Sequence, residues 1–337
     1  MEQLQLAGTG RQTSRLGFGC SALVGTKTRK ESAALLDAVW DAGIRHIDVA
    51  PMYGWGAAEI CVGEFLRRKG GDATVTTKYG IPPPRGQSLA GLARHLARPV
   101  IKALPGMKQR LARAAKATLG ESRKATFSAA EARASLDRSR KVMQTERIDL
   151  WLMHDVSAAN ITDPALLSFM REAVTAGIIG DFGASHGIAE IPALYEQRRE
   201  YCRVLQFEWS VREPVPQFPG SFRIHHRSLA HNFSALRAEL EQRPGLRRKW
   251  SDDLGCDPGM PETLSALMLK AALVLNPESI VLVSSQSPAH IAANVRTAED
   301  ATLEETARRF YGLVQRDLNG APQESETGVE PARISPR

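Results

Sequence analysis

The sequence of 337 residues lacks the features that mark membrane and secreted proteins. It has no run of about 18 apolar residues, the length that a transmembrane helix needs. Its first residues, MEQLQLAGTGRQ, lack the basic start and apolar stretch of a secretory signal peptide. We therefore expect a soluble, cytoplasmic protein with no integral membrane segment.

Cysteine is scarce, and the four cysteines show no C-x-x-C spacing. This absence argues against a disulfide framework and against a zinc site. His225 and His226, adjacent on an expected strand, point to opposite faces and so cannot bind one metal ion together. We predict no metal site and expect ordinary buried or partly buried thiols. The cysteines are Cys20, Cys61, Cys202 and Cys256.

Acidic residues are almost absent from one segment, which carries the excess positive charge. Pro82 to Ala125 contains ten Lys or Arg and one acid, whereas the rest of the chain has 34 basic and 36 acidic residues, for a total of +7. This segment also lacks aromatic residues, so it has no stacking platform for nucleic-acid bases. We expect no nucleic-acid binding.

Short apolar runs alternate with longer helical patterns along most of the chain. Strands are expected at 15–22, 45–50, 74–79, 149–154, 179–185, 204–209, 222–228 and 280–285. Helices are expected at 31–42, 57–68, 129–143, 164–176, 188–199, 262–275 and 288–295. Eight strands separated by helices favour an α/β fold, a single (β/α)8 TIM barrel spanning residues 1–318.

A doubly wound sheet is the competing interpretation of the same pattern. Residues 17–22, GFGCSA, match the dinucleotide-binding pattern G-x-G-x-x-A, and Asp41 follows at a suitable distance. However, residues 11–16 are polar where that fingerprint needs a buried strand. A short glycine-containing barrel strand is the favoured explanation.

Residues 81–125 form an insertion after the third strand. Its leucines, alanines and basic residues recur at helical spacing, which predicts one or two amphipathic helices broken at Pro99 and Pro105. The insertion fits a solvated flap, a lid or docking element for an acidic partner, or a membrane-surface contact. The polar tail, 319–337, is expected to be disordered.

Polar residues end several expected strands, where the active site of a TIM barrel lies. Asp48, Lys78 and His154 end the second, third and fourth strands, and Tyr53 follows Asp48 in a loop. A nearby Lys78 ammonium would favour the tyrosine phenolate, and Asp48 would hold that lysine charged. The four residues therefore predict an acid/base unit suited to hydride transfer to a carbonyl.

Carboxylates raise a rival hypothesis, the acid pair of a glycosidase. Glu59, Asp155 and Glu208 are the candidates. Asp155 would point away from His154 if its strand continues, and no second acid clearly ends an opposing strand. We therefore do not predict glycoside hydrolysis.

Six motifs, in order, resemble those of the aldo-keto reductases and cover most of the chain. IDVAPMYGWGAAEICVGEFL is similar to DTA-x-x-YG-x-G-x-x-E, VTTKYG to the T-K strand, and ASLDRSRKVMQTERIDLWLMH to SL-x-R…T-x-x-IDL…H. AGIIGDFGASH is similar to G-x-I-R-x-x-G-x-SN, LQFEWS to Q-x-x-YN, and VLVSSQSPAHIAANV to the closing phosphate-binding segment. The resemblance implies a barrel that binds NADP or NAD without a Rossmann domain.

The resemblance also implies residue roles. Asp48, Tyr53, Lys78 and His154 would form the catalytic tetrad, with Tyr53 as general acid in reduction. Ser185 and Gln206 would hold the nicotinamide carboxamide, and Trp209 would stack on its ring. Ser285, Gln286 and Asn294 would contact the adenosine half, while His186, Ser228 and His290 complete the expected cofactor site. Trp55 would line the substrate pocket.

Some positions depart from the family pattern. His186 replaces an asparagine, and Trp209 replaces a tyrosine. Family members that prefer NADP usually have lysine or arginine at the positions that match Ser284 or Gln286 and His290, and this chain has neither there. Arg296 is close enough in sequence to compensate, so the preference for NADP over NAD is left open. The function implied is an NAD(P)-dependent oxidoreductase that interconverts an alcohol and an aldehyde, ketone or sugar carbonyl. The alternative is a nicotinamide-binding regulatory or scaffold protein with little turnover.

Overall fold

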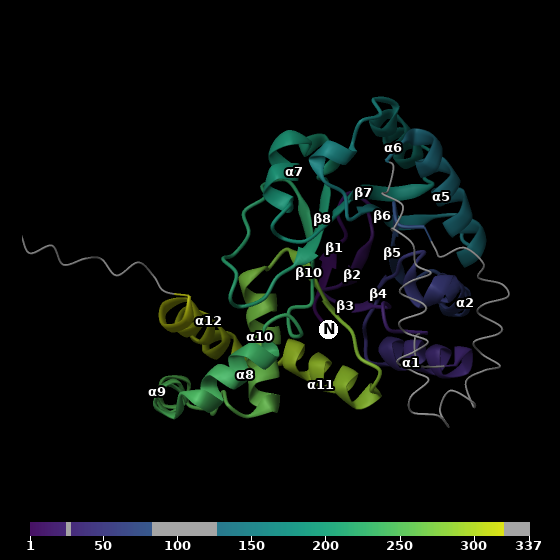
Figure 1. The fold of residues 1–337 in the computed structure, drawn as a ribbon. Helices are drawn as coiled ribbons and strands as arrows, with labels where there is room; N and C mark the ends of the chain where they lie inside the picture. The colour runs from purple at the N-terminus through teal and green to yellow at the C-terminus, as the bar shows by residue number, and fades with distance from the viewer. Residues whose placement is uncertain (25–27, 83–126, 320–337) are drawn as a thin grey trace, which may run out of the picture.

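A computed structural model describes residues 1–24, 28–82 and 127–319, and eight parallel strands close into a barrel within this part of the chain (Figure 1). The barrel strands are β3 (Leu16–Gly19), β4 (His46–Asp48), β5 (Thr74–Tyr79), β6 (Ile148–His154), β7 (Ile179–Ser185), β8 (Val204–Glu208), β9 (Phe222–His226) and β10 (Ser279–Val283). They follow one another in chain order, and β10 pairs with both β9 and β3. The predicted TIM barrel is confirmed.

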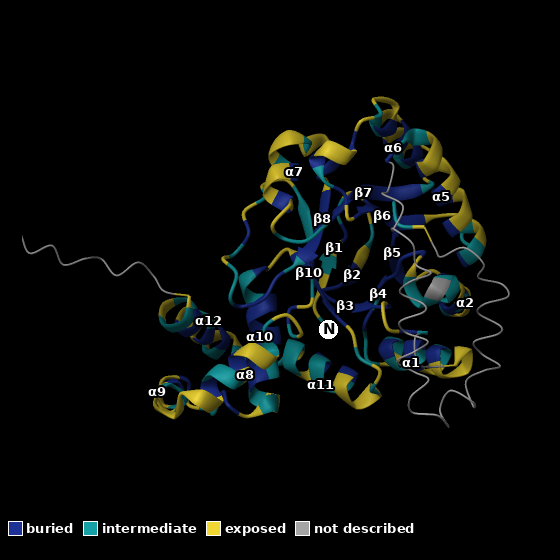
Figure 2. Cartoon of the chain, viewed as in Figure 1, coloured by how far each residue is buried: buried dark blue, intermediate teal, exposed yellow. Residues whose placement is uncertain are grey.

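Helices cover the outside of the barrel, with buried faces toward the strands and exposed faces toward solvent (Figure 2). The expected helices are α1 (Arg29–Asp41), α2 (Ala57–Lys69), α5 (Ala129–Met143), α6 (Ala165–Thr175), α7 (Ile191–Gln197), α10 (Pro261–Leu275) and α11 (Pro288–Glu299). Their starts follow local chemistry: Thr28 and Glu31 form a capping box on α1, and Ser128 caps α5.

Three further helices were not predicted: α8 (Phe233–Gln242), α9 (Pro244–Leu254) and α12 (Glu304–Leu318). α8 and α9 are short and rich in charge, so each offers few apolar positions to a periodicity search. Their buried residues, including Leu236 and Trp250, join Phe310 of α12 in a second apolar core beside the barrel. Tertiary packing therefore stabilises these helices more than their own sequence pattern does.

Alternation along each strand divides the barrel's side chains into an outer and an inner set. Leu205 and Phe207 of β8 face the helices, whereas Val204 packs in the apolar barrel interior with Leu152 of β6 and Ile224 of β9. Continuing this alternation toward the carboxyl ends brings polar residues inward. The interior is therefore apolar at its centre and polar at its carboxyl end, where the site is expected.

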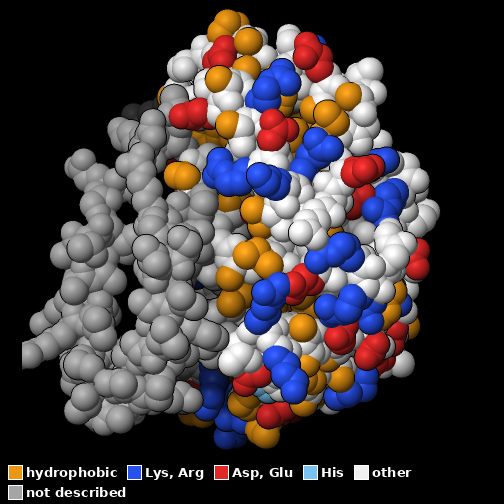
Figure 3. Space-filling model, turned by 90° about the vertical axis from the view of Figure 1, so that its right-hand side faces the viewer, with side chains coloured by type: hydrophobic (Ala, Val, Ile, Leu, Met, Phe, Trp, Pro, Cys, Tyr) orange, Lys and Arg blue, Asp and Glu red, His pale blue; other side chains and the backbone are white. Residues whose placement is uncertain are grey.

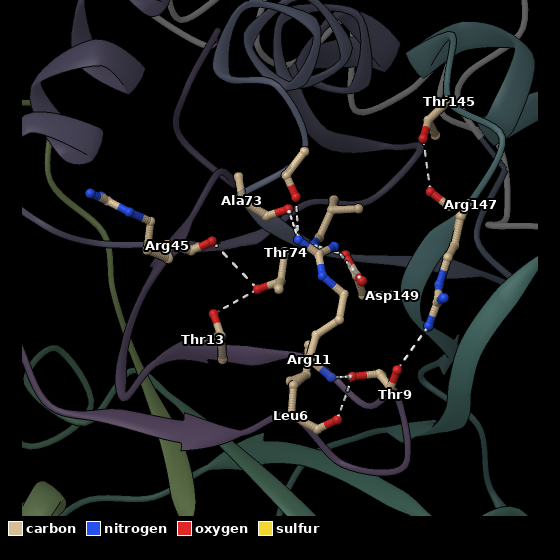
Figure 4. A network of polar contacts seen from close by, with 12 residues as sticks. Leu6, Thr9, Arg11, Thr13, Arg45, Ala73, Thr74, Thr145, Arg147 and Asp149 are labelled. Atoms are coloured by element: carbon tan, nitrogen blue, oxygen red, sulfur yellow. Dashed lines mark hydrogen bonds and ion pairs between the residues drawn. The ribbon is translucent and has the colours of Figure 1, made fainter.

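A hairpin of β1 (Gln3–Gln5) and β2 (Gln12–Ser14) covers the amino end of the barrel. Arg11 Nη1 donates to Asp149 Oδ1 at 2.7 Å, and the Thr13 and Thr74 hydroxyl oxygens lie 2.7 Å apart (Figure 4). Leu6 of the hairpin loop enters the apolar interior. These contacts close the amino end, which leaves the carboxyl end for function.

Gly17 and Gly19 belong to barrel strand β3, so the doubly wound interpretation is wrong. A Cβ atom on Gly17 would lie 2.6 Å from Leu282 Cδ2 and 2.9 Å from Ile280 Cγ2. The glycine is thus required by close packing inside the barrel.

Lys and Arg side chains intermingle with Asp and Glu on the face shown in Figure 3. None of the described helices is long and apolar enough to cross a membrane. The insertion 81–125 falls between β5 and α5, but all of it beyond Pro82 lies outside the described residues, as does the tail after Asn319.

Candidate active site

A buried ion pair lies at the carboxyl ends of β4 and β5. Lys78 Nζ donates to both carboxylate oxygens of Asp48, at 2.7 and 2.8 Å, and to the Val49 carbonyl at 3.2 Å. Asp48 is 3% exposed and Lys78 is 1% exposed. The pairing of β4 with β5 sets this contact, because Asp48 lies opposite Thr76, two residues before Lys78.

Tyr53 and His154 lie beside this pair. Tyr53 is the first residue of a short 3-10 helix, Tyr53–Gly56, that follows β4. The Tyr53 and His154 rings pack edge to face, with their centres 6.2 Å apart. Lys78 Nζ lies 5.2 Å from the centre of the Tyr53 ring. The structure therefore brings together all four residues of the expected tetrad.

Burial and charge set the protonation of these groups. Burial raises the pKa of Tyr53, and the Lys78 ammonium opposes that rise. Burial by itself lowers the pKa of Lys78, but the Asp48 carboxylate and Tyr53 more than offset it, so the net shift is upward. Burial and Lys78 lower the pKa of His154 to about 3, which keeps its imidazole neutral at physiological pH.

Gln206 and Ser185 adjoin the tetrad on β8 and β7. The Gln206 amide donates from Nε2 to Asp48 Oδ2 at 2.7 Å, while its Oε1 is buried without a partner among the described residues. Ser185 lies opposite both His154 and Gln206 in the strand register and is buried. His186 is half-buried, and its Nδ1 accepts a hydrogen bond from the Gly187 amide at 2.7 Å.

The residues expected near the adenosine half lie between β10 and α11 or in that helix. The Ser285 hydroxyl accepts from the Ser287 amide at 3.1 Å, and Gln286 Nε2 donates to the Ala22 carbonyl at 3.2 Å. His290 is exposed and Asn294 is half-buried, both on α11. α11 begins without a side-chain cap, so amides of its first turn can receive an anion.

Trp209 is not brought to the interior of the barrel. It follows β8 on the side of Leu205 and Phe207, is fully buried, and donates from Nε1 to the Pro214 carbonyl at 2.9 Å. Its ring has no exposed face, which argues against the expected stacking on nicotinamide.

The structure describes the side chain of Ser228 but not that of Trp55, the two remaining expected site residues. Ser228 is buried just after β9, and its hydroxyl oxygen has no partner among the described residues. The side chain of Trp55 lies outside the described part of the structure.

Glu208 and His226 also face inward, although neither was expected in the site. They pair directly across β8 and β9, and His226 Nε2 lies 4.0 Å from Glu208 Oε2. The period of two counted from Gln206 is the signal that could have found Glu208.

The carboxylates considered for glycoside hydrolysis are dispersed. Asp155 is exposed, with a backbone φ of 52°, and Glu59 is buried, where it accepts a hydrogen bond from Thr77 Oγ1 at 2.8 Å. Glu208 instead neighbours His226. The described residues also contain no group of three or more His, Cys, Asp or Glu arranged to hold a metal ion.

Comparison with known proteins gives both sequence and structural matches. The model of the aldo/keto reductase family matches residues 15–212. Pyridoxal 4-dehydrogenase from Microbacterium luteolum is 43% identical over 82 residues, which are 23% of this chain and 24% of that protein. D-threo-aldose 1-dehydrogenase from a Pseudomonas species is 44% identical over 79 residues, 22% of this chain and 24% of that protein. The matched stretch thus spans about a quarter of these curated relatives.

Solved structures share the fold over nearly the whole chain. The holo form of an aldo-keto reductase from Bacillus halodurans has a TM-score of 0.63 at 19% identity, covering 92% of this chain and 96% of its own. Glycerol dehydrogenase from Gluconobacter oxydans has a TM-score of 0.63 at 16% identity, covering 99% of each chain. The family match extends over more than half of the sequence, and the chain belongs to the aldo/keto reductase family.

Proposed function

We propose that this protein is an NAD(P)-dependent oxidoreductase that interconverts a carbonyl compound and its alcohol, with Tyr53 as the general acid in reduction. The observation that carries the proposal is the buried Asp48–Lys78 ion pair beside Tyr53 and His154. A phenol next to a fixed ammonium can release its proton at lower cost than a phenol in an apolar pocket.

Each residue of the tetrad has a distinct part in the proton transfer. The bound nicotinamide supplies a hydride to the carbonyl carbon in reduction and accepts one in oxidation. Tyr53 donates its proton to the carbonyl oxygen, and the Lys78 ammonium stabilises the phenolate that remains. Asp48 keeps Lys78 charged, and the neutral imidazole of His154 can donate a hydrogen bond that positions the oxygen.

The residues around the tetrad fit a nicotinamide. Gln206 Oε1 is buried and has no partner among the described residues, so it can accept a hydrogen bond from a carboxamide NH2 group. Ser185, opposite Gln206, offers a hydroxyl to the same group. The uncapped start of α11, with Ser285 and Gln286 before it and Asn294 within it, would hold the phosphate and adenosine end.

NAD is the cofactor that the chain's own residues favour. Ser284, Gln286 and His290 offer no guanidinium or ammonium group for a 2′-phosphate. Arg296 lies six residues after His290 in α11, about 9 Å along the helix axis. This separation makes Arg296 a poor substitute for a basic residue at the helix start.

The first prediction is that Tyr53→Phe lowers kcat by about 100- to 10,000-fold, because it removes the proton donor but keeps the ring. Nicotinamide absorbance, followed with NAD(H) and NADP(H) over a panel of aldehydes, ketones, sugars and alcohols, measures the change. Tyr195→Phe is the matched control, since Tyr195 is a half-buried tyrosine of α7 that donates to the Pro219 carbonyl.

Unchanged turnover in Tyr53→Phe contradicts the mechanism. Binding of the nicotinamide cofactor to the wild-type protein can be measured by quenching of tryptophan fluorescence. If the cofactor binds but no compound on the panel is turned over, the result favours the regulatory alternative.

A further inference from the structure

A cavity of about 260 Å³ lies near the amino ends of β8 and β9, away from the tetrad at the carboxyl ends of the strands. Its wall comes from α6, from the 3-10 helix η3 (Arg199–Tyr201), from the residues that lead into β8 and from the loop before β9. Those two strands start at Val204 and Phe222, directly after this wall. The lining residues are Arg171, Arg199, Glu200, Cys202, Arg203 and 219–221.

Positive charge exceeds negative charge at this cavity. Three of the lining residues are arginines, and one, Glu200, is an acid. The Cys202 thiol adds no negative charge at neutral pH, because burial and the nearby Glu200 carboxylate raise its pKa to about 12. Asp181 of β7 pairs with Arg203. Three arginines against these two carboxylates leave one positive charge in excess.

Arg203 is held in place but keeps donors to spare. Its Nε donates to Asp181 Oδ1 at 2.5 Å, and its Nη2 donates to Asp181 Oδ2 at 3.3 Å. Asp181 is buried and also accepts from the Gly8 amide at 3.2 Å, so this carboxylate is a fixed anchor. The Arg203 side chain is 50% exposed. A guanidinium has five N–H donors, and those not directed at Asp181 have no other partner among the described residues.

The other two arginines lack a carboxylate partner within the described part of the chain. Arg199 Nη2 donates to the Pro219 carbonyl at 3.1 Å, and its guanidinium carbon lies 4.9 Å from the centre of the Tyr195 ring. Tyr195 donates to the same carbonyl at 2.7 Å, which fixes Arg199 against the loop before β9. Arg171, exposed on α6, donates no side-chain hydrogen bond to a described residue.

Guanidinium groups from separate elements around one small cavity match a phosphate group. Their N–H donors form charge-assisted, often bidentate hydrogen bonds with phosphate oxygens. A tetrahedral dianion accepts from several sides at once, whereas a carboxylate has one charge and two oxygens in a plane. The cavity is smaller than the roughly 300–1,000 Å³ of sites that enclose whole small molecules, so it suits a single phosphate group.

The range of the attraction also favours a small ligand. The residues outside the segment 83–126 are nearly neutral in total, with 34 basic and 36 acidic side chains. The excess charge of the cavity therefore acts at contact distance and does not create a field over the whole barrel. A small anion can enter and meet the arginines directly, while an extended polyanion would also meet the acidic residues around them.

We propose that this cavity binds a phosphate dianion through Arg171, Arg199 and Arg203. The dianion is inorganic phosphate or the phosphate group of a small monoester, and Glu200 weakens its binding by repulsion. The cavity lies at the opposite end of the barrel from the tetrad and from the start of α11. The proposal is therefore independent of the proposed function.

Calorimetric titration with inorganic phosphate and with glycerol 3-phosphate tests the proposal, at low salt and about pH 8, where a phosphate group is mostly dianionic. The wild-type protein should bind with a Kd on the order of 1 mM, and binding should weaken as sodium chloride is added. The double variant Arg171→Gln/Arg199→Gln should bind about tenfold more weakly or not at all. Glu200→Gln should bind about two- to fivefold more tightly.

Controls assign the binding to this cavity. Arg308→Gln removes an exposed arginine of α12 and should bind as the wild type does. Because the start of α11 is another place for a phosphate, the assignment uses the difference between the wild type and the double variant. Thermal unfolding without ligand should show the same midpoint for both, since the substituted side chains are exposed.

The two probes distinguish the sources of the phosphate group. Binding of both supports a site for phosphate monoesters, and binding of inorganic phosphate alone supports a site for the free anion. Equal affinity of the wild type and the double variant for phosphate would overturn the proposal, as would the absence of saturable binding to the wild type. Acetate that binds as tightly as phosphate at equal ionic strength would also overturn it, because the cavity would then not select a dianion.

Discussion

The carboxylate of Asp48 accepts hydrogen bonds from both Lys78 and Gln206. Lys78 is expected to lower the free energy cost of forming the Tyr53 phenolate, and the Gln206 amide is expected to hold the cofactor. Asp48 thus connects these two groups. Loss of Asp48 would leave the Lys78 ammonium buried without its partner, a state that costs several kcal/mol or shifts the lysine toward its neutral form. In the proposed mechanism, orientation of the cofactor and acid/base chemistry would therefore be coupled through a single side chain.

His46 predicts how stability depends on pH. Its two ring nitrogens lie 2.9 Å from Thr74 Oγ1 and 3.0 Å from Thr76 Oγ1, and burial lowers its pKa to about 4. Unfolded histidine titrates near ~6.5, so the unfolded chain binds a proton that the folded chain excludes as pH falls from about 6.5 to about 4. The contribution of His46 is complete above the unfolded value and declines below it.

We expect His46→Gln to reduce the loss of unfolding free energy between pH 7 and pH 5 by about 2 kcal/mol relative to the wild type. Urea unfolding at pH 5, 6 and 7 measures this difference in slope. His231→Gln, a change at an exposed histidine near Glu213, is the matched control. Equal slopes for wild type and His46→Gln would contradict the prediction.

Individual site residues could be predicted where a polar residue ends an apolar strand. Asp48, Lys78 and His154 stand out in this way, and the structure brings them together with Tyr53. Trp209 was expected to stack on the cofactor because motif matching aligns residues without regard to the face of the strand. Counting by twos from Gln206 reaches Glu208 and leaves Trp209 outside, but only the structure shows that Gln206 faces inward, through Val204 in the barrel interior and the contact of Gln206 with Asp48.

At the scale of elements, the close approach of α2 to α5 depends on one glycine. A Cβ atom on Gly63 of α2 would lie 2.2 Å from the Met143 carbonyl oxygen and 2.5 Å from Met143 Cα. Both are backbone atoms and cannot rotate away. The two helices must therefore separate if Gly63 gains a side chain, and α2 directly follows the segment that carries Tyr53.

We expect Gly63→Ala to lower the unfolding free energy by about 3 kcal/mol through overpacking, although alanine is the better helix former. Chemical denaturation at constant pH measures the change. Gly312→Ala in α12 is the control, because a Cβ atom there meets nothing within 4 Å and should stabilise the protein by up to about 1 kcal/mol. A Gly63→Ala protein as stable as the wild type would show that α2 and α5 adjust without cost.

Most barrel strands could be predicted because each is a short, largely apolar run buried on both faces, whereas β9 (FRIHH) is partly polar and only partly buried. The hairpin β1–β2 could not, since its strands have three residues each and are mostly polar, and they form by contact with the amino end of the barrel. α8, α9 and α12 depend in the same way on a second core that no single segment specifies. Long-range packing, absent from local periodicity, decides these elements.

At the scale of the whole molecule, the positive charge is separable from the barrel. The described face in Figure 3 mixes both signs of charge, and the residues outside 83–126 include 34 basic and 36 acidic side chains. A nearly neutral barrel has no field of its own to draw an anionic partner. Any electrostatic attraction therefore depends on residues 83–126, which carry the remaining ten basic residues and one acid.

The two ends of that segment return to the same place on the barrel. The Tyr79 ring of β5 meets the Phe127 ring edge to face at 5.5 Å, and a Cβ atom on Gly80 would lie 2.6 Å from Phe127 Cε1. A short linker can therefore join Pro82 to Phe127 without pulling β5 away from α5. The Tyr79 ring also stacks on Trp151 at 4.3 Å, so the join rests on a packed aromatic cluster.

Replacing residues 83–126 with a short Gly-Ser linker should leave the barrel folded, with a thermal midpoint within about 5 °C of the wild type, because loop length has a small effect on stability. The replacement takes the net charge from +7 to −2, so retention on anionic vesicles or a polyanion column at low salt should be lost.

If the segment is a lid, KM or kcat in the carbonyl assay changes as well. If it is a docking element, turnover is unchanged and only retention is lost. A midpoint lower by more than about 15 °C would contradict the separation of segment and barrel, because it would mean that these residues contribute to the core.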